Sequence, residues 1–402
     1  MFGKRTRLYT NFNLINLLHI LKNIFLKKKN FQHNLRKYLK TENIILTSLG
    51  RTALYDIVKI IISSKKKKKF IISPFTIPAV IHAINYAGGE TVYVDMNSET
   101  GLIDEKLLHE NIDENTAGVI ITHLYSNQKN IKEFIEKFKD KIFIIEDAAI
   151  NFGSNIDDRH LGTLGDFGFF SFNVVKNLNT LNGGAIYIKD KDYFEKYVAS
   201  RKINPFSYKA TLNLILTAII IKIFFNNFSY QVFHYFLKIV YVKKIDFVLK
   251  RIYPILFHKQ ENEIPNIYSC DFNWLMNEVG NYNLNKIESD FEKRLKKAKL
   301  YFELINDTVA YKTNCFEGEN SLLEYAIILK EIDNYSAHKI LMENGYDIRH
   351  TWYINNAKYL KNYNSNEYQS TEIIEKKILC LPIHKNINTK DIEKICKIIN
   401  NF

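Results

Sequence analysis

The sequence predicts an α/β fold with a doubly wound, mostly parallel sheet. Apolar runs alternate with stretches that have the three- and four-residue apolar spacing of helices, and this alternation favours such a sheet. The runs lie at 70–72, 91–95, 118–123 and 143–145. The last run ends on Glu146 and Asp147. A buried strand that ends in an acidic residue places a carboxylate at the edge of the sheet where ligands collect.

The composition indicates a globular protein with reduced cysteines. The chain has 402 residues, enough for one large or two medium domains, and 46% of them are hydrophobic. Its four cysteines, Cys270, Cys315, Cys380 and Cys396, lack the spacing of metal ligands. They are typical of a cytoplasmic protein rather than of a disulfide framework or a zinc site. We therefore expect no metal site.

The net charge of +13 indicates an acidic partner. Lysine and arginine are concentrated in residues 1–40, which contain no acidic residue. The sequence has no recognisable nucleic-acid-binding module. A phospholipid surface is therefore the acidic partner that the charge favours, and we expect no nucleic acid partner.

Residues 1–44 are predicted to be a basic amphipathic segment. Residues 12–26 are apolar with few interruptions, and Lys27, Lys28 and Lys29 follow. This run is too short to span a bilayer, and it lacks the small-residue cleavage site of a secretory signal. Two interpretations remain open: a helix at a membrane interface, and a helix packed on the body of the protein or on a partner subunit.

The large domain is predicted to span residues 45–204. A short strand ends at Gly50, and a helix with apolar spacing follows. The first amides of a helix lack partners and the helix dipole attracts anions, so a phosphate site can form at Gly50. Arg51 can add a direct charge. An ordinary turn before a helix is the alternative interpretation.

The stretch 143–187 carries the residues that point to chemistry. After Asp147, a second apolar run at 167–172 leads to Ser171 and then to Lys176. These side chains suit pyridoxal phosphate, with Lys176 bound to its aldehyde as a Schiff base, Asp147 paired with the ring nitrogen and Ser171 on the phosphate. A lone lysine after a buried strand is more often merely solvated, but the combination favours the cofactor.

Residues 205–260 are predicted to be a hydrophobic and basic insertion. Long apolar runs at 210–220 and 230–242 are accompanied by lysines. Neither run reaches the roughly 20 residues that a spanning helix needs. Lysines at the polar edges are typical of interfacial helices. A hydrophobic dimer contact or a cover for the sheet is the alternative.

Residues 261–402 are predicted to form a linking helix and a small α+β domain. Apolar spacing over 272–305 predicts one long amphipathic helix. A strand at 325–329 and a helix at 336–344 follow, and a further strand and helix end the chain.

Four motifs carry a resemblance to a known family. They are Glu146-Asp147-Ala148-Ala149, the glycine-rich stretch 162–166, Phe170-Ser171-Phe172 followed by Lys176-Asn177, and Gly183-Gly184-Ala185. Together they resemble the DegT/StrS family of sugar aminotransferases, and the resemblance covers about residues 45–200 and 270–402. It implies the fold type I of pyridoxal phosphate transferases. That fold has a large domain with a mixed, mostly parallel seven-stranded sheet and a small α+β C-terminal domain.

The resemblance also implies roles for residues that bind the cofactor. Lys176 falls on the cofactor lysine of the family, whereas the relatives that dehydrate sugars have a histidine there. Gly50 and Arg51 match the phosphate loop, with Arg51 in place of a small hydroxyl residue. Ile77 stands where an aromatic residue often stacks on the cofactor ring.

One cofactor contact of the family comes from a neighbouring subunit. Asn273 matches an asparagine that reaches the phosphate of the neighbour, but Leu275 replaces the arginine that accompanies it. One hypothesis is that Arg51 supplies the missing charge.

Substrate contacts are implied at His123, Arg349 and His350. A structural histidine is the alternative for His123, and surface residues are the alternative for the other two. Ile150 stands where relatives often place a glutamine on the ring hydroxyl of the cofactor, so that contact is expected to be lost.

The resemblance implies a pyridoxal phosphate-dependent aminotransferase that moves an amino group from glutamate to a nucleotide-linked keto-sugar. Such a product would serve the synthesis of a surface polysaccharide or another glycan. A cytoplasmic homodimer is expected, with a peripheral position on the inner face of the cytoplasmic membrane as a further hypothesis. Two alternatives stay open: a pyridoxal phosphate-dependent sugar dehydratase or lyase, and a non-catalytic, membrane-associated relative.

Overall fold

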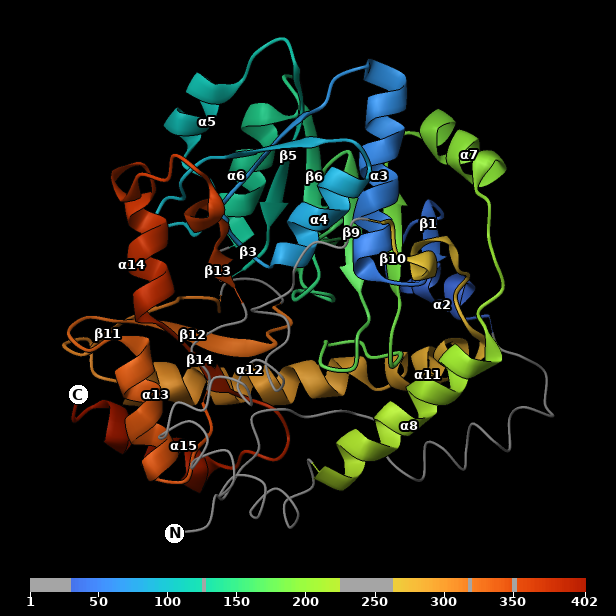
Figure 1. Ribbon diagram of the computed structural model, residues 1–402. Helices are drawn as coiled ribbons and strands as arrows, with labels where there is room; N and C mark the ends of the chain where they lie inside the picture. Colours follow the sequence, from blue (N-terminus) through green and yellow to red (C-terminus); the bar gives the residue numbers. More distant parts are fainter. Residues whose placement is uncertain (1–29, 125–127, 225–262, 317–319, 349–352) are drawn as a thin grey trace.

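The computed structural model describes residues 30–124, 128–224, 263–316, 320–348 and 353–402. A seven-stranded sheet with the order β1-β10-β9-β6-β5-β2-β4 forms its centre (Figure 1). The strands are β1 (Ile44–Thr47), β2 (Lys69–Ile72), β4 (Glu90–Tyr93), β5 (Thr116–Thr122), β6 (Phe143–Asp147), β9 (Phe167–Ser171) and β10 (Gly184–Ile188). β10 runs antiparallel to both of its neighbours, and the other neighbouring pairs are parallel. The predicted mixed, mostly parallel sheet is confirmed.

Parallel strands bring the predicted functional residues to one edge of this sheet. β6 ends at Asp147, and β9 ends at Ser171. β1 leads into α3 (Gly50–Lys65), and β5 leads directly into His123. Because these four strands run in the same direction, their carboxyl ends lie at the same edge.

Helices cover both faces of the sheet, because a parallel sheet has to be buried on both sides. α3, α4 (Pro78–Tyr86) and α7 (Lys191–Ser200) pack on one face, and α5 (Glu105–Asn111) and α6 (Gln128–Phe138) pack on the other (Figure 1). Successive residues of β6 serve the two cores. Ile145 lies with α3 in one core, and Ile144 lies with Phe134 of α6 in the other.

The C-terminal part forms the predicted small α+β domain. Its antiparallel sheet consists of β11 (Ala310–Lys312), β12 (Glu324–Leu329) and β14 (Ile378–Pro382). The helices are α12 (Ile287–Leu304), α13 (Asn334–Glu343), α14 (Gln369–Lys377) and α15 (Thr389–Ile399). Tyr301, Ile327 and Ile395 lie fully buried in its core. β13 (Ile354–Asn355) pairs with β3 (Phe75–Thr76) and joins this domain to the large one.

Short elements complete the chain. They are the hairpin of β7 (Asn155–Ile156) and β8 (Arg159–His160), and the 3-10 helices η2 (Asn266–Ser269), η3 (Asn356–Tyr359) and η4 (Ser365–Tyr368).

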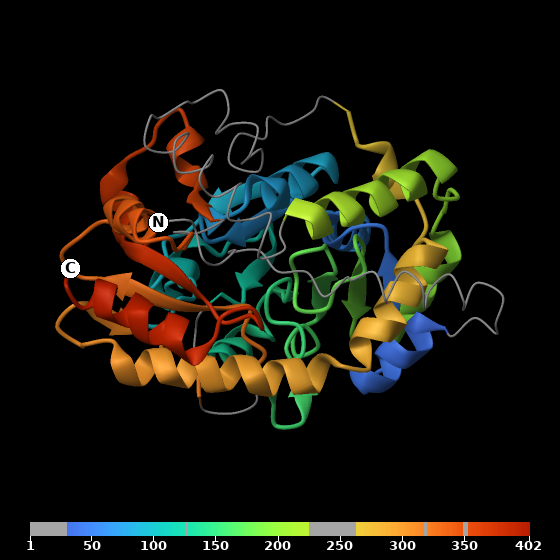
Figure 2. The same ribbon diagram turned by 90° about the horizontal axis from the view of Figure 1, so that it is seen from below.

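The long helix predicted over 272–305 is wrong, because the structure has two helices there. α11 (Trp274–Leu284) and α12 are separated at Asn285 and Lys286, and Figure 2 shows the change in direction between them. Asn283 donates a hydrogen bond from Nδ2 to the carbonyl of Asn179 at 2.6 Å, and its own carbonyl accepts from the amide of Lys286 at 3.1 Å. These two contacts hold the chain at the junction between the two helices.

Two predicted segments are described in part. α2 (Phe31–Tyr38) packs on α11 and β1, whereas residues 12–26 lie outside the described residues. α8 (Tyr208–Phe224) comes from the predicted insertion, and residues 225–262 lie outside. None of the described helices combines the length and the apolar character needed to cross a membrane. The domain boundaries at 44, 204 and 260 stay predictions.

Candidate active site

Asp147 is buried at the end of β6 and has few hydrogen-bond donors. Its Oδ1 accepts a hydrogen bond from the amide of Ala149 at 3.0 Å. Burial raises the pKa of Asp147, and the Ala149 amide and the charges of Lys176 and His123 oppose that rise. Lys176 follows β9, the parallel neighbour of β6, so both residues lie at the same edge of the sheet.

Lys176 lies in the loop between β9 and β10, and the residue after it anchors this loop. Asn177 donates from Nδ2 to the carbonyl of Ile150 at 3.1 Å and to that of Ser321 at 2.6 Å. Its Oδ1 accepts from Arg294 of α12 at 3.0 Å. All these groups are buried, so breaking the contacts would leave polar atoms without water or partners. The half-buried Lys176 is thus presented from a fixed backbone.

Gly50, Ser171 and Gly184 meet at the N-terminus of α3. Ser171 pairs with Gly184 across β9 and β10. A Cβ on Gly50 would lie 2.8 Å from the Cβ of Ser171, and a Cβ on Gly184 would lie 2.5 Å from the amide nitrogen of Gly50. Leu49, which precedes the helix, provides no side-chain cap. The first amides of α3 and Ser171 therefore lie together and form a cradle of a kind that fits a phosphate group.

Arg51 lies in the first turn of the same helix and is half-buried. Within the described ranges its guanidinium forms no ion pair and no side-chain hydrogen bond. A guanidinium next to a helix N-terminus adds charge to an anion site, and it can bind a phosphate through two hydrogen bonds.

Glu146 has a structural role that sequence reasoning did not assign. Its carboxyl group is fully buried and accepts hydrogen bonds from the amides of Gly162 at 2.9 Å, Leu164 at 2.6 Å and Gly165 at 2.7 Å. Its Oε2 also lies 2.7 Å from Nε2 of His123. The sequence does carry a signal for this role: an acidic residue ends a buried strand, and a glycine-rich loop follows it. The amides of such a loop need an acceptor.

His123 follows β5, and its side chain is fully buried and bonded to Glu146. Its predicted contact with the substrate stays a prediction. Arg349 and His350, the other predicted substrate residues, lie outside the described residues.

Ile77 precedes α4 and is half-buried. It packs in an apolar cluster with Phe75, Ile150 and Tyr353. The two positions at which apolar residues replace the aromatic residue and the glutamine of the family motif therefore belong to one cluster.

Asn273 caps α11. Its Oδ1 accepts from the amide of Leu275 at 2.7 Å, and its Nδ2 donates to the hydroxyl of Thr211 at 2.7 Å. Both polar groups are therefore engaged within the chain. Its contact with the cofactor phosphate of a neighbouring subunit stays a prediction.

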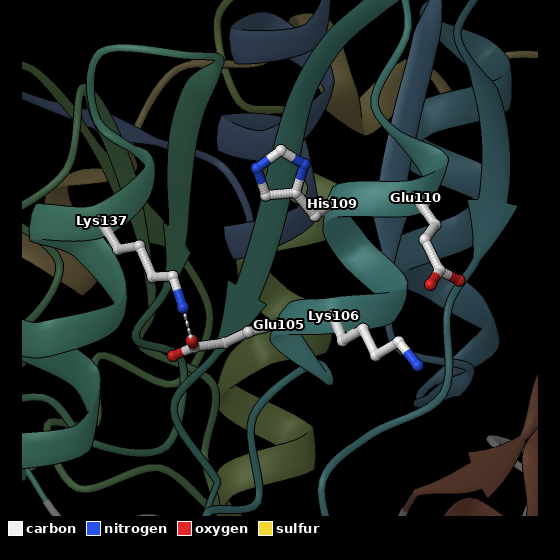
Figure 3. A pocket seen from close by; sticks show the side chains of 5 residues that line it. All are labelled: Glu105, Lys106, His109, Glu110 and Lys137. Carbon is white, nitrogen blue, oxygen red and sulfur yellow. Dashed lines mark hydrogen bonds and ion pairs between the residues drawn. The ribbon is translucent and has the colours of Figure 1, made fainter.

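A surface hollow of about 570 Å³ lies elsewhere, between α5 and α6 (Figure 3). It is lined by Glu105, Lys106, His109, Glu110 and Lys137, and Lys137 is paired with Glu105. Lys137 belongs to the last turn of α6, the end of this helix away from the carboxyl edge of the sheet. In the parts of the chain described by the structure, no cluster of His, Cys, Asp and Glu could hold a metal ion.

Comparison with known proteins decides the family. The model of the DegT/DnrJ/EryC1/StrS aminotransferase family matches residues 21–208 and 266–400. The chain belongs to this family. The match omits 209–265, which overlaps the predicted insertion. Pyridoxal phosphate is the cofactor of the aminotransferases of this family, as predicted, and the cradle at Gly50 and the pair of Lys176 and Asp147 fit it.

This chain is similar to relatives that are named for two different activities, amino transfer and dehydration. A GDP-perosamine synthase of Escherichia coli O157:H7 is 31% identical over 31% of this chain and 35% of its own length. A GDP-4-keto-6-deoxy-D-mannose 3-dehydratase of Yersinia pseudotuberculosis is 24% identical over 80% of this chain and 76% of its own length. The structure of Helicobacter pylori PseC, an aminotransferase of pseudoaminic acid biosynthesis, aligns with a TM-score of 0.71 at 15% identity over 99% of this chain and 98% of that one. The chain thus matches about a third of the length of the perosamine synthase.

Gly50→Ala is expected to weaken the binding of pyridoxal phosphate by about tenfold or more, because the new methyl group meets the Cβ of Ser171 and the backbone of the cradle. Gly280→Ala is the matched control, since the nearest atoms to its methyl group would be those of the Phe31 ring, 2.9 Å away and outside the site. Fluorescence titration with the cofactor measures both. Equal affinity in the Gly50 and Gly280 variants would show that phosphate binds elsewhere.

Proposed function

We propose that this protein is a pyridoxal phosphate-dependent aminotransferase that transfers an amino group from glutamate to a nucleotide-linked keto-sugar, for the synthesis of a surface polysaccharide or another glycan. One observation carries the proposal: Asp147 and Ser171 end neighbouring parallel strands at the edge of the sheet where Gly50 opens α3, and Lys176 lies in the loop that follows Ser171. An amine, an acid and a phosphate site in this arrangement match the three functional ends of the cofactor.

When bound, the cofactor supplies an aldehyde and an electron-withdrawing ring. Asp147 would hold a proton on the ring nitrogen, because a buried carboxylate favours a cationic partner. Lys176 would bind at the aldehyde carbon and, once displaced by the donor amine, carry the proton between donor and cofactor. Ser171 and the first amides of α3 would hold the phosphate. The bonds of Asn177 would keep Lys176 in reach throughout.

The substrate class rests on the relatives. The GDP-perosamine synthase and the Yersinia dehydratase are both named for GDP-linked sugars. A nucleotide-linked keto-sugar is therefore the substrate class that we propose here. The dehydratase is the second candidate activity, because that relative matches more of the chain. Lys176 favours amino transfer over dehydration, since a lysine occupies the position at which the dehydrating relatives have a histidine.

Lys176→Ala is expected to lower amino transfer by about 10²–10⁴-fold or more, because the positioned amine that moves the proton is lost. The assay offers keto-sugar nucleotides with ¹⁵N-labelled glutamate and follows the label and 2-oxoglutarate by mass spectrometry. Lys191→Ala, at an exposed lysine of α7, is the control. Full label transfer by the Lys176 variant would refute the proposal. A dehydrated sugar without label, made by the wild type, would establish the dehydratase instead.

Arg51→Ala is expected to weaken cofactor binding by about tenfold, since a charged hydrogen bond to the phosphate is lost. Arg51 would then replace the arginine that the family places at the position of Leu275. Lys59→Ala, on an exposed turn of the same helix, serves as the control. Titration of the apo-protein with pyridoxal phosphate measures all three proteins. If the Arg51 variant binds as tightly as the wild type, the hypothesis is wrong.

We also propose that the protein works as a homodimer and binds the inner face of the cytoplasmic membrane. α8 supports the second proposal, because it is apolar on two sides. Leu214 and Ile215 pack toward Leu275, while Leu212 and Ile220 are 55% and 53% exposed. The exposed side includes Lys209, and a helix with an apolar face and lysines is suited to an anionic membrane surface.

Replacement of Leu212, Leu216 and Ile220 by serine is expected to reduce sedimentation with anionic lipid vesicles by about tenfold or more, because three exposed apolar side chains are lost. Replacement of the exposed Leu360 and Ile373 by serine is the control. Unchanged sedimentation of the α8 variant would contradict the membrane proposal. If the α8 variant still binds vesicles but no longer has the mass of a dimer, this face contacts the second subunit instead.

A further inference from the structure

Leu181, in the loop between β9 and β10, has a backbone conformation that leucine rarely adopts. Its φ is +71°, in the left-handed region that favours glycine. Among the described residues, four other non-glycine residues have a positive φ, and all of them are exposed: Lys40, Lys66, Asp157 and Asp158. Leu181, by contrast, is apolar and only 6% exposed. A conformation of this kind costs free energy, so it persists only where the surrounding structure holds it.

The side chain of Leu181 lies in a small apolar cluster at one side of the lysine loop. Leu275 and Val279 of α11 form the rest of its buried part, and Leu214 and Ile215 of α8 pack against it. The burial of these side chains is favourable and offsets the cost of the backbone conformation. The surroundings that hold Leu181 therefore come from two helices, α11 and α8.

α8 is seated on this cluster by one of its faces. Thr211, Leu214 and Ile215 share that face, because residues three and four positions apart are neighbours on a helix. Thr211 accepts a hydrogen bond at 2.7 Å from Nδ2 of Asn273, the residue that caps the start of α11 (Figure 1). The family model does not match residues 209–265, so nearly all of α8 lies outside the matched part of the chain. Part of the support of Leu181 thus comes from a segment beyond the family match.

One asparagine connects Leu181 to the turn that carries Lys176. The amide of Leu181 donates to Oδ1 of Asn179 at 2.6 Å, and Nδ2 of Asn179 donates to the carbonyl of Val174 at 3.1 Å. The amide of Lys176 donates to the carbonyl of Asn173 at 2.9 Å, so Val174 lies within the turn that leads to Lys176. Asn179 is buried, and the loss of either of its bonds is therefore costly. A change in the backbone of Leu181 would be passed through Asn179 to this turn.

We propose that Leu181 is a positioning residue for the amine of Lys176, and that α8 is the element that holds Leu181 in place. Asn177 anchors the loop directly after Lys176, and Asn179 anchors it before Lys176. Without the packing of α8, Leu181 would relax toward a negative φ, and the second anchor would be lost. This proposal rests on the proposed function only in that Lys176 is there the residue that binds the aldehyde.

Two substitutions of Leu181 separate the effect of its backbone from that of its side chain. Leu181→Gly and Leu181→Ala both remove most of the packing, but only glycine adopts a positive φ without strain. We expect Leu181→Gly to bind pyridoxal phosphate about tenfold more tightly than Leu181→Ala. Titration of the apo-protein, followed by the absorbance of the Schiff base, measures both. Equal binding by the two variants would mean that the backbone conformation has no effect, and would overturn the proposal.

Substitutions in α8 test whether this helix acts through Leu181. Replacement of Leu214 and Ile215 by alanine is expected to weaken cofactor binding by about tenfold in the wild-type chain, and by less than about twofold in the Leu181→Gly background. Replacement of Leu300 and Leu304 by alanine is the control, because these half-buried residues of α12 pack in the core of the small domain. The control should leave the binding unchanged in both backgrounds. The same loss in both backgrounds for the α8 variant would overturn the proposal.

A second arm uses the full chain without added cofactor. Hydrogen exchange, read by mass spectrometry, reports on the loop at 172–183, where the amides of Lys176, Thr180 and Leu181 are hydrogen-bonded. The α8 variant should exchange this loop about tenfold faster than the wild type, and the acceleration should vanish in the Leu181→Gly background. Unchanged exchange in the α8 variant would overturn the proposal. If the wild type binds no cofactor, the proposed function fails while this arm still decides the role of Leu181.

Discussion

Two adjacent carboxyl groups end a buried strand, and their accommodation without water is the constraint on which the site depends. A buried charge is costly unless it is paired and hydrogen-bonded. Glu146 meets this requirement with three amides and His123, and so it holds the glycine-rich loop in place. Asp147 has the amide of Ala149 and depends on nearby charge. Glu146, which has more hydrogen-bond donors, is therefore a structural acid, whereas Asp147, which has fewer, is suited to bind a cationic ligand.

The cradle at α3 is set by strand order rather than by a local motif. β10 lies between β1 and β9 and runs antiparallel to both. Its first residue, Gly184, therefore lies beside Ser171, the last residue of β9, and beside Gly50, which follows β1. The short distances leave no room for a Cβ at either glycine. The phosphate site that we propose at this place thus depends on both the reversed strand and the two small residues.

Much of this site could be predicted from the sequence, because strand ends and helix starts have local signals. Asp147, Ser171 and Gly50 lie at such ends, and the parallel order of the strands places them at one edge. The pair of Glu146 and His123 could not be predicted, since it depends on β5 and β6 being neighbours in the sheet. The break between α11 and α12 lies beside a contact of the same long-range kind, from Asn283 to Asn179 in the loop between β9 and β10.

The departures from the family motif are connected physically. Ile77 and Ile150 lie in one apolar cluster with Phe75 and Tyr353. A polar side chain at position 150 would be buried in this cluster, whose apolar side chains offer it no hydrogen-bond partner, and such burial is costly. The carbonyl of Ile150 meanwhile anchors Asn177 next to Lys176. In the proposed function, this apolar cluster provides shape but no hydrogen bond to the cofactor ring. The charged ends of the cofactor, at Asp147 and at the cradle beside Arg51, would then carry most of the specificity of its binding.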